Sequence, residues 1–339
     1  MKKTIALMIV CIVQFLFSSC VAETETMIRI SGSANQTHIT IADNQVYVTL
    51  DKEGWFSNHY SIYSIVPGEK PYRIASFRGY YSLPFVYRES LLINKLDVTP
   101  LTHYINSSTW CTLGLDGSIK PFDIMDEETE ADDVFYAATN ATLFQIVEKD
   151  NVYQVMVWDA ELNECQETGV QANTFMPKVF PSLVFSADFG ASECQVFDAV
   201  SGDFFTIPRF YDGSMNAVIL YEDKLFCVDN SSIILYEVTT EKYSTIYSYD
   251  QYHHLYGNYN IFLQDESVFF SDPSSKQIMR YDLATEKIVQ TKARTNSCSE
   301  FVVVGDWVYS VKEDDESKWM YVMISNTLTG EEFLSIIRR

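Results

Sequence analysis

The chain has 339 residues, of which 46 are acidic and 24 are lysine or arginine, so its formal net charge is −22. A surface with this excess of negative charge repels phosphate backbones, which excludes nucleic acid as a partner. The length is enough for one large domain or two ordinary domains.

The first residues have the pattern of an export signal. Lys2 and Lys3 precede an apolar run, Thr4 to Phe17, which is too short to cross a hydrocarbon core of about 30 Å comfortably. The preference for small residues before the cleavage site predicts a cut after Ala22, with residues 1–22 as the signal peptide. Alternatively, Phe17-Ser18-Ser19-Cys20 resembles a bacterial lipobox. Residues 1–19 would then be the signal, and Cys20 would carry the lipid.

Both alternatives predict an exported protein. Cleavage before Glu23 predicts a secreted or periplasmic protein, whereas lipidation of Cys20 predicts a protein anchored to the outer surface of a membrane. The sequence contains no second long apolar stretch. A lipid at Cys20 is therefore the one membrane attachment that we expect.

A pair of residues, aliphatic and then aromatic or large apolar, recurs about every 40 to 50 residues, the period of a propeller blade. The copies are Val46-Tyr47, Leu91-Leu92, Val134-Phe135, Val184-Phe185, Leu225-Phe226, Val268-Phe269 and Val308-Tyr309. Each pair lies in a short run rich in β-branched and aromatic residues, which predicts a strand. We interpret the pair as one core strand of each blade.

A second element repeats in phase with the first: an apolar strand, an acidic or polar residue, and a turn with Thr or Ser beside Gly or Glu. The clearest copies begin at Val155, Val196, Leu235, Met279 and Ile324, and degenerate copies span 63–70 and 115–118. A side-chain carboxylate or amide can bond the backbone of its own turn, so this element predicts a hairpin between the two outer strands of a blade.

Two markers in each repeat predict an all-β protein, in which residues 23–339 form a single β-propeller domain of about seven four-stranded blades. Six or eight blades remain alternatives because the stretch 76–124 is poorly patterned. Ring closure often uses a blade shared between the two ends of the chain. We therefore expect strands near Met27–Ile30 or His38–Ile41 to pair with the sheet formed by residues 301–337.

One blade resembles a known class of propellers. Phe269-Phe270-Ser271-Asp272 is followed by Ile278-Met279-Arg280-Tyr281-Asp282-Leu283. These residues resemble a blade of the YWTD-type propellers of low-density lipoprotein receptors, with Phe269-Phe270-Ser271-Asp272 in place of the Tyr-Trp-Thr-Asp motif. The chain is also similar to uncharacterised exported bacterial propellers. The resemblance implies the architecture and leaves the function open.

The sequence gives no sign of catalytic or metal-binding chemistry. It contains neither a Gly-x-Ser-x-Gly elbow nor a glycine-rich phosphate loop. Cys111, Cys165, Cys194, Cys227 and Cys298 are scattered without zinc spacing, and we interpret most of them as buried strand residues, Cys227 in particular. The acidic runs 126–133 and 313–316 do not follow the calcium pattern of an EF-hand, and we interpret them as solvated loops. We expect no catalytic residues, no metal and no cofactor.

One stretch between two clear repeats has the composition of a binding surface. It is rich in tyrosine, histidine and asparagine, as recognition loops often are. We select as candidate binding residues Tyr252, His253, His254, Tyr256 and Tyr259. Adjacent histidines in a strand point to opposite faces, so His253 and His254 make a poor pair of ligands for one metal.

These patterns favour an exported, monomeric, non-catalytic propeller that binds a protein, peptide or glycan at one loop face. The alternative is a hydrolase or lyase that acts on polysaccharide or peptide, with carboxylates at the mouth of the channel. The sequence does not identify such a carboxylate pair among its 46 acids.

Overall fold

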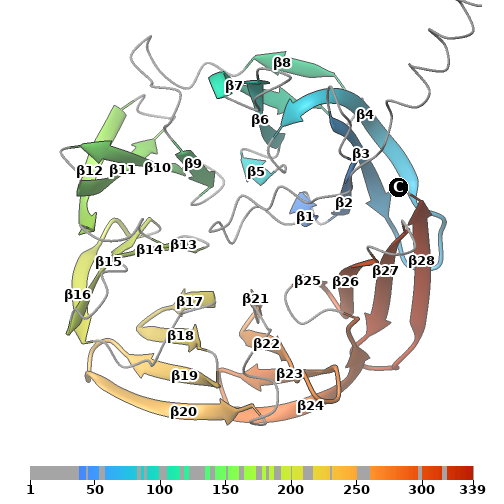
Figure 1. Cartoon of the computed structure of the whole chain (residues 1–339). Coiled ribbons are helices and arrows are strands. Elements are labelled where there is room, and N and C mark those ends of the chain that lie inside the picture. Colours follow the sequence, from blue (N-terminus) through green and yellow to red (C-terminus); the bar gives the residue numbers. More distant parts are fainter. Residues whose placement is uncertain are drawn as a thin grey trace, which may run out of the picture.

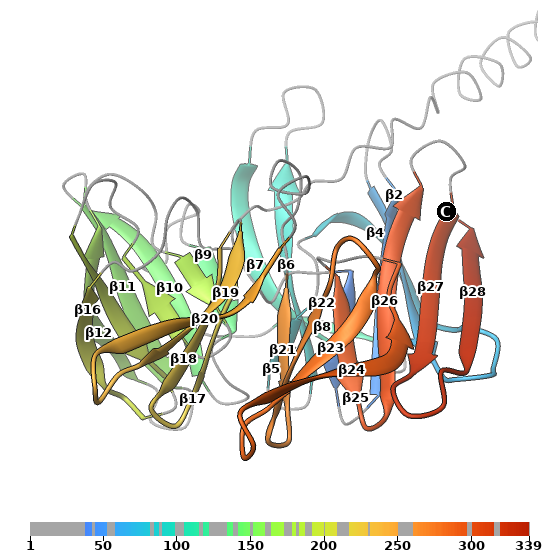
Figure 2. The same ribbon diagram turned by 90° about the horizontal axis from the view of Figure 1, so that it is seen from below.

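The computed structural model shows a ring of seven four-stranded blades, with the first strand of each blade nearest the axis (Figure 1). Seen from the side, the strands run between the two faces of the ring (Figure 2). The structure describes residues 38–42, 45–52, 58–81, 85–87, 90–98, 105–114, 118–121, 134–137, 142–149, 152–159, 164–172, 178–180, 183–186, 192–199, 201–208, 217–229, 231–249, 260–296, 300–314 and 319–338. The predicted all-β propeller of about seven blades is confirmed.

The blades follow one another along the chain, and the strands within each blade are antiparallel. Blade 1 consists of β1 Ile39–Ala42, β2 Gln45–Lys52, β3 Asn58–Ile65 and β4 Tyr72–Tyr81. Blade 2 consists of β5 Phe85–Tyr87, β6 Ser90–Val98, β7 Ile105–Leu113 and β8 Ile119–Pro121. Blade 3 consists of β9 Val134–Ala137, β10 Thr142–Lys149, β11 Val152–Asp159 and β12 Glu164–Ala172. Blade 4 consists of β13 Lys178–Phe180, β14 Leu183–Phe185, β15 Glu193–Asp198 and β16 Phe204–Pro208. Blade 5 consists of β17 Ala217–Tyr221, β18 Lys224–Val228, β19 Ser232–Glu237 and β20 Lys242–Ser248. Blade 6 consists of β21 Ile261–Gln264, β22 Ser267–Ser271, β23 Gln277–Asp282 and β24 Lys287–Arg294. Blade 7 consists of β25 Phe301–Val304, β26 Trp307–Asp314, β27 Trp319–Asn326 and β28 Glu332–Arg338.

The repeated pair of apolar residues lies on the second strand of a blade in six of its seven copies. Residues of these pairs are almost fully buried, as Leu225 and Phe226 of β18 illustrate. The interpretation as core strands is therefore confirmed. Val134-Phe135 is the exception, because it lies on β9, the first strand of blade 3. The pair on the second strand of that blade, β10, is Leu143-Phe144, and both residues are buried.

The second repeated element forms the turn between the third and fourth strands, as predicted. The polar residue at the end of the third strand accepts hydrogen bonds from its own turn. Thr285 N–H donates to Asp282 Oδ1 at 2.8 Å, and Leu328 N–H donates to Asn326 Oδ1 at 2.9 Å. These bonds satisfy backbone donors that the tight turn leaves unpaired.

The pairing of the two outer strands contains a β-bulge in several blades, which bends the strand locally. In blade 6 the bulge is stabilised by Thr291, whose hydroxyl donates to Ile278 O at 2.8 Å and accepts from Ala293 N–H at 3.1 Å. In blade 3, Thr168 makes the equivalent bonds to Val155 O and Val170 N–H. The bulge of blade 6 brings Lys292 N–H within 2.9 Å of Thr327 O in blade 7.

The ring closes through side-chain packing between blades 1 and 7. Residues 38–41 were expected to add a strand to the sheet of the last blade, and this prediction is wrong. Ile39–Ala42 pairs with β2 of its own blade, and β25 to β28 already complete blade 7. A shared core joins the two blades instead, with Val46 and Val48 on one side and Val322 and Ile324 on the other. Residues 27–30 lie outside the described part of the chain.

Three of the cysteines are buried in strands: Cys111, Cys194 and Cys227. Burial raises the pKa of the Cys227 thiol well above its ordinary value, which keeps the sulfur protonated and inert. The interpretation of Cys227 as a core residue is confirmed. In the described ranges no helix is long and apolar enough to span a membrane.

Candidate functional site

The site residues selected from the sequence are not among the described residues. Cys20 lies before residue 38, and Tyr252, His253, His254, Tyr256 and Tyr259 lie between residues 249 and 260. The chain leaves β20 and enters β21 at the face of the ring opposite to the β21–β22 turn, because adjacent strands of a blade are antiparallel.

At the edge of this same face, a tyrosine of blade 5 bonds to an aspartate of blade 6. The Tyr247 hydroxyl donates to the Asp272 carboxylate. Burial, with a smaller contribution from Asp272, raises the pKa of Tyr247 to about 12. Burial alone would raise the pKa of Asp272, but hydrogen bonds from Ser274, Tyr247 and Ser275 outweigh it and lower that pKa. The pair joins the two blades.

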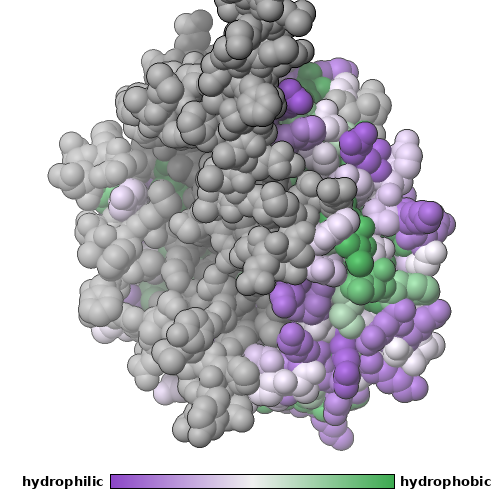
Figure 3. All heavy atoms as spheres, turned by 45° about the vertical axis from the view of Figure 1, so that its right-hand side comes forward, coloured by the Kyte–Doolittle hydropathy of each residue, from purple (hydrophilic) through white to green (hydrophobic). Residues whose placement is uncertain are grey.

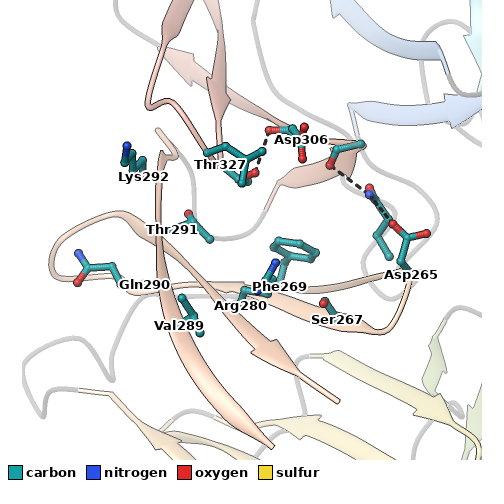
Figure 4. A pocket seen from close by; sticks show the side chains of 13 residues that line it. Asp265, Ser267, Phe269, Arg280, Val289, Gln290, Thr291, Lys292, Asp306 and Thr327 are labelled. Carbon is teal, nitrogen blue, oxygen red and sulfur yellow. Dashed lines mark hydrogen bonds between the residues drawn. The ribbon is translucent and has the colours of Figure 1, made fainter. Parts of the chain in front are cut away.

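A pocket of about 500 Å³ lies on the other face, between blades 6 and 7 (Figure 4). Its polar lining comes from the β21–β22, β25–β26 and β27–β28 turns, from the ends of β21 and β22 beside the first of them, and from strands β23 and β24. The lining residues are Gln264, Asp265, Ser267, Phe269, Arg280, Val289, Gln290, Thr291, Lys292, Gly305, Asp306, Thr327 and Leu328.

The preceding interface, between blades 5 and 6, shows how the same space is filled elsewhere in the ring. The Tyr281 ring of blade 6 packs edge-on against Phe226 of blade 5, with the ring centroids 5.6 Å apart. Beside it, Lys224 Nζ lies 2.8 Å from Glu286 Oε1, and this hydrogen bond is the largest of the causes that raise the Lys224 pKa. A ring and an ion pair thus close this interface.

Blade 7 lacks these groups at the equivalent positions. The residue before the turn-capping Asp282 is Tyr281, whereas the residue before the equivalent Asn326 is Ser325. Ser325 is fully buried and faces blade 6, because its hydroxyl accepts from Arg294 N–H at 3.1 Å. The positions of Lys224 and Glu286 are taken by Ser267 and Gly330. The interface that contains the pocket therefore lacks both the ring and the ion pair of the preceding interface.

The third strand of blade 6 also departs from the repeat. Arg280, on β23, stands two residues before the capping Asp282, where blades 4, 5 and 7 have buried Val196, Leu235 and Ile324. Arg280 pairs across the sheet with Phe269, so both side chains face blade 7. A cation therefore replaces an aliphatic core residue in the lining of the pocket.

The Arg280 guanidinium is only partly satisfied by its neighbours. Its Nη2 lies 3.9 Å from Asp282 Oδ2, and 39% of its side chain is exposed. Its Nε atom is nevertheless buried and has no hydrogen-bond partner among the described residues. Buried donors in proteins are nearly always paired, so this Nε is an unusual donor in the lining of the pocket.

The remaining charges lie on exposed residues at the rim of the pocket. Asp265, at φ +48° in the β21–β22 turn, accepts at 3.2 Å from the Gln264 amide, which also donates to Gly305 O. Asp306 follows Gly305 in the equivalent turn, and its backbone oxygen accepts from Thr327 N–H at 2.8 Å. Lys292 is exposed on the bulge of β24. The rim thus offers both an anion and a cation.

The sequence contains a signal for this site. When the third strands are aligned on their turn-capping residue, Arg280 is the charged residue at a position that is otherwise aliphatic in the described copies of blades 4, 5 and 7. The same alignment shows that Ser325 replaces an aromatic residue, which is Phe197, Tyr236 or Tyr281 in the three preceding blades.

A second surface feature is an apolar patch on the outer strand of blade 7. Leu334 is 61% exposed and Ile336 is 52% exposed, and both lie on β28, where Figure 3 shows apolar side chains gathered among hydrophilic ones. Exposed apolar patches on soluble proteins often mark contact surfaces.

The described residues include no group of three His, Cys, Asp or Glu that could hold a metal ion.

No family model matches this chain, and no curated protein matches it. Among solved structures, the uncharacterized protein lmo1340 from Listeria monocytogenes EGD-e is similar over 93% of this chain and 98% of its own, with 12% identity and a TM-score of 0.52. The computationally designed Ika8 protein matches over 89% of this chain and 87% of its own, with 11% identity and a TM-score of 0.49. TolB from Acinetobacter baumannii matches over 86% and 80%, with 10% identity and a TM-score of 0.43. Similarity at this level of identity extends to the fold alone.

Proposed function

We propose that this protein is an exported, monomeric, non-catalytic binding scaffold that holds a protein, peptide or glycan on one face of the propeller. The observation that carries the proposal is the pocket between blades 6 and 7, where three side chains that close the preceding interface are absent and a cation enters the lining. Departures from a repeat are expected at functional sites, because a packed core gains nothing from them. The apolar patch at Leu334 and Ile336 adds a second contact surface.

The motif Phe269-Phe270-Ser271-Asp272 supports a relation to the YWTD-type propellers. Its Asp272 accepts from Ser274 N–H at 2.8 Å, and Asp229, in the weaker copy of blade 5, accepts from Ser231 N–H at 2.7 Å. The carboxylate thus holds the turn after the second strand in both blades. Export is part of the same proposal, and mass spectrometry of the mature N-terminus tests it by distinguishing a free Glu23 from a lipidated Cys20.

The test of the binding function is capture from an envelope extract of the source cells. Immobilised protein should retain one partner reproducibly, and the purified partner should bind the protein in solution. A variant whose pocket is filled, Ser325→Tyr, should retain less of it. If repeated captures retain no common partner, or if no retained partner binds once purified, the proposal is wrong.

A second candidate is the hydrolase or lyase. Asp265 and Asp306 place two carboxylates at one pocket, and glycoside hydrolases in general need such a pair. A panel of glycan and peptide substrates distinguishes the two candidates, since a scaffold turns over none of them. Any turnover that is lost in Asp265→Asn or Asp306→Asn would favour the enzyme.

A further inference from the structure

The pocket between blades 6 and 7 has the chemistry of a site for an aromatic ring. One interface earlier, the Tyr281 ring packs against Phe226, and it belongs to the same core as Leu235. The equivalents of Phe226 and Leu235 between blades 6 and 7 are Phe269 and Arg280, and both line the pocket. The equivalent of Tyr281 is Ser325, which brings no ring to this interface, and the part of Phe269 that remains exposed, 6% of the residue, borders the pocket.

The residue that replaces the aliphatic neighbour of that ring supplies a positive charge. Arg280 keeps a buried Nε without a partner among the described residues, and its Nη2 is only within 3.9 Å of Asp282. A guanidinium presents parallel N–H groups whose spacing matches the two oxygens of a carboxylate or of a phosphate. Lys292 adds a second cation at the rim.

The carboxylates around the pocket limit what kind of anion it can accept. Asp282, Asp265 and Asp306 repel a ligand that is anionic throughout, such as a polyphosphate. They repel a ligand with a single carboxylate less strongly, because the repulsion scales with the ligand's charge, and they can accept a hydrogen bond from a hydroxyl or amine at its far end. A singly charged carboxylate on an aromatic body therefore fits better than a phosphate.

We propose that this pocket binds a carboxylate-bearing aromatic group, with the ring on Phe269 and the carboxylate on Arg280. The inference rests on the proposed binding function, since it names the chemical group of the ligand that the pocket receives. Two sources share this chemistry: a free aromatic acid, and the C-terminal aromatic residue of a peptide.

The first experiment uses the purified protein and four probes in titration calorimetry. The free-acid arm compares 4-hydroxyphenylacetate with its neutral amide, 4-hydroxyphenylacetamide. The peptide arm compares N-acetyl-Gly-Gly-Tyr with the same peptide amidated at its C-terminus. Each carboxylate should bind about tenfold or more tightly than its amide, because the bond to a guanidinium is charge-assisted. The arm whose carboxylate probe has the lower dissociation constant identifies the source of the ligand, a free aromatic acid or a peptide C-terminus.

Variants test the residues. Arg280→Gln should raise the dissociation constants of the carboxylate probes about tenfold. Lys287→Gln, which removes one positive charge outside the pocket lining, should change these constants less than about twofold. Ser325→Tyr should abolish binding by filling the ring site. Thermal melts check that each variant is folded, and the acid-against-amide comparison on the unaltered protein needs no variant.

Three results would overturn the inference. One is that no probe binds at up to about 10 mM, well above the roughly millimolar dissociation constant expected of a ligand this small. The others are equal binding of acid and amide, and unchanged binding in Ser325→Tyr. Failure of the probes with successful capture of a partner refutes the ligand chemistry alone. Binding of the probes without any partner refutes the proposed function alone.

Discussion

Phe226→Ala and Phe269→Ala remove equivalent side chains from two neighbouring interfaces, and we expect the first to lower the free energy of unfolding more than the second. Phe226 is fully buried and pairs edge-on with Tyr281, at 5.6 Å between centroids. Removing a buried phenylalanine costs about 3–5 kcal/mol, and the aromatic pair adds about 0.5–1.5 kcal/mol. We therefore expect Phe226→Ala to lower the free energy of unfolding by about 5 kcal/mol.

Phe269 occupies the same position in blade 6 and is also buried, but it borders the pocket. The partner ring is replaced by Ser325, so the pair energy is absent and part of the cavity already exists. We expect Phe269→Ala to cost about 3 kcal/mol, at the lower end of the range for a buried phenylalanine. The predicted difference between the two variants is therefore about 1–2 kcal/mol.

Urea unfolding followed by tryptophan fluorescence and by circular dichroism measures both costs. The double variant Phe226→Ala with Tyr281→Ala provides the control, because residues in contact should show a coupling energy of about 0.5–1.5 kcal/mol. If Phe269→Ala proves as costly as Phe226→Ala, or if Phe226 and Tyr281 are not coupled, then the pocket is not a site of missing aromatic packing.

Three further predictions concern the repeated turns and bulges. Thr168→Val should lower the free energy of unfolding by about 1–3 kcal/mol in urea melts, because Val155 O and Val170 N–H lose their partner in a buried site. Asn326→Ala should cost about 1–2 kcal/mol in the same melts through two lost bonds to its turn, whereas Asn326→Asp should stay near the unaltered protein. Asp272→Asn should lower the Tyr247 pKa from about 12, but not to the ordinary 10.0, because burial is the larger cause; carbon-13 NMR of labelled tyrosine measures it. Since the folded pKa of Asp272 is lowered, its stabilisation is present above its unfolded pKa and is lost as the pH falls through the folded value, so Asp272→Asn should also reduce the loss of stability in acid.

Much of the architecture could be predicted from the sequence because each blade repeats the same physical requirement. A buried second strand such as β18 needs two large apolar residues side by side, and a tight outer turn needs a side chain like that of Asp282 to satisfy its backbone. Both requirements leave marks at a fixed period. Val134-Phe135 was assigned to the wrong strand because β9 carries the same kind of pair as β10.

Ring closure could not be predicted in the same way. Residues 39–42 have the pattern of a strand, but a strand pattern does not specify its neighbour. The chain begins its first blade at β1 and completes its last blade at β28, so no strand is left to be shared among the described residues. Contacts of Val46 and Val48 with Val322 and Ile324 hold the two ends instead, and such packing leaves no local signal.

The pocket is harder still to predict, because it depends on two blades at once. Ser325 is unremarkable in its own strand, and Arg280 lies in the copy of the repeat that is otherwise the most regular. Their significance appears only when each is compared with its equivalents and when the register places them across one interface. The candidate loop around Tyr252 was selected by composition instead, and its residues lie outside the described part of the chain.

A propeller can tolerate such an opening because its stability is close to a sum over neighbouring interfaces. The interface between blades 6 and 7 keeps a smaller core of Phe269, Phe301 and Val308, together with the backbone bond from Lys292 to Thr327. Among the described residues, the interfaces between blades 1 and 2, 3 and 4, 4 and 5, 5 and 6, and 7 and 1 each have their own core, so the absence of a ring and an ion pair at one place does not propagate to them. Side chains that fill cavities commonly stabilise proteins, and the preceding interface shows which side chains would fill this one. The opening lies at the interface where Arg280 lines the pocket, which is where we propose that a ligand binds.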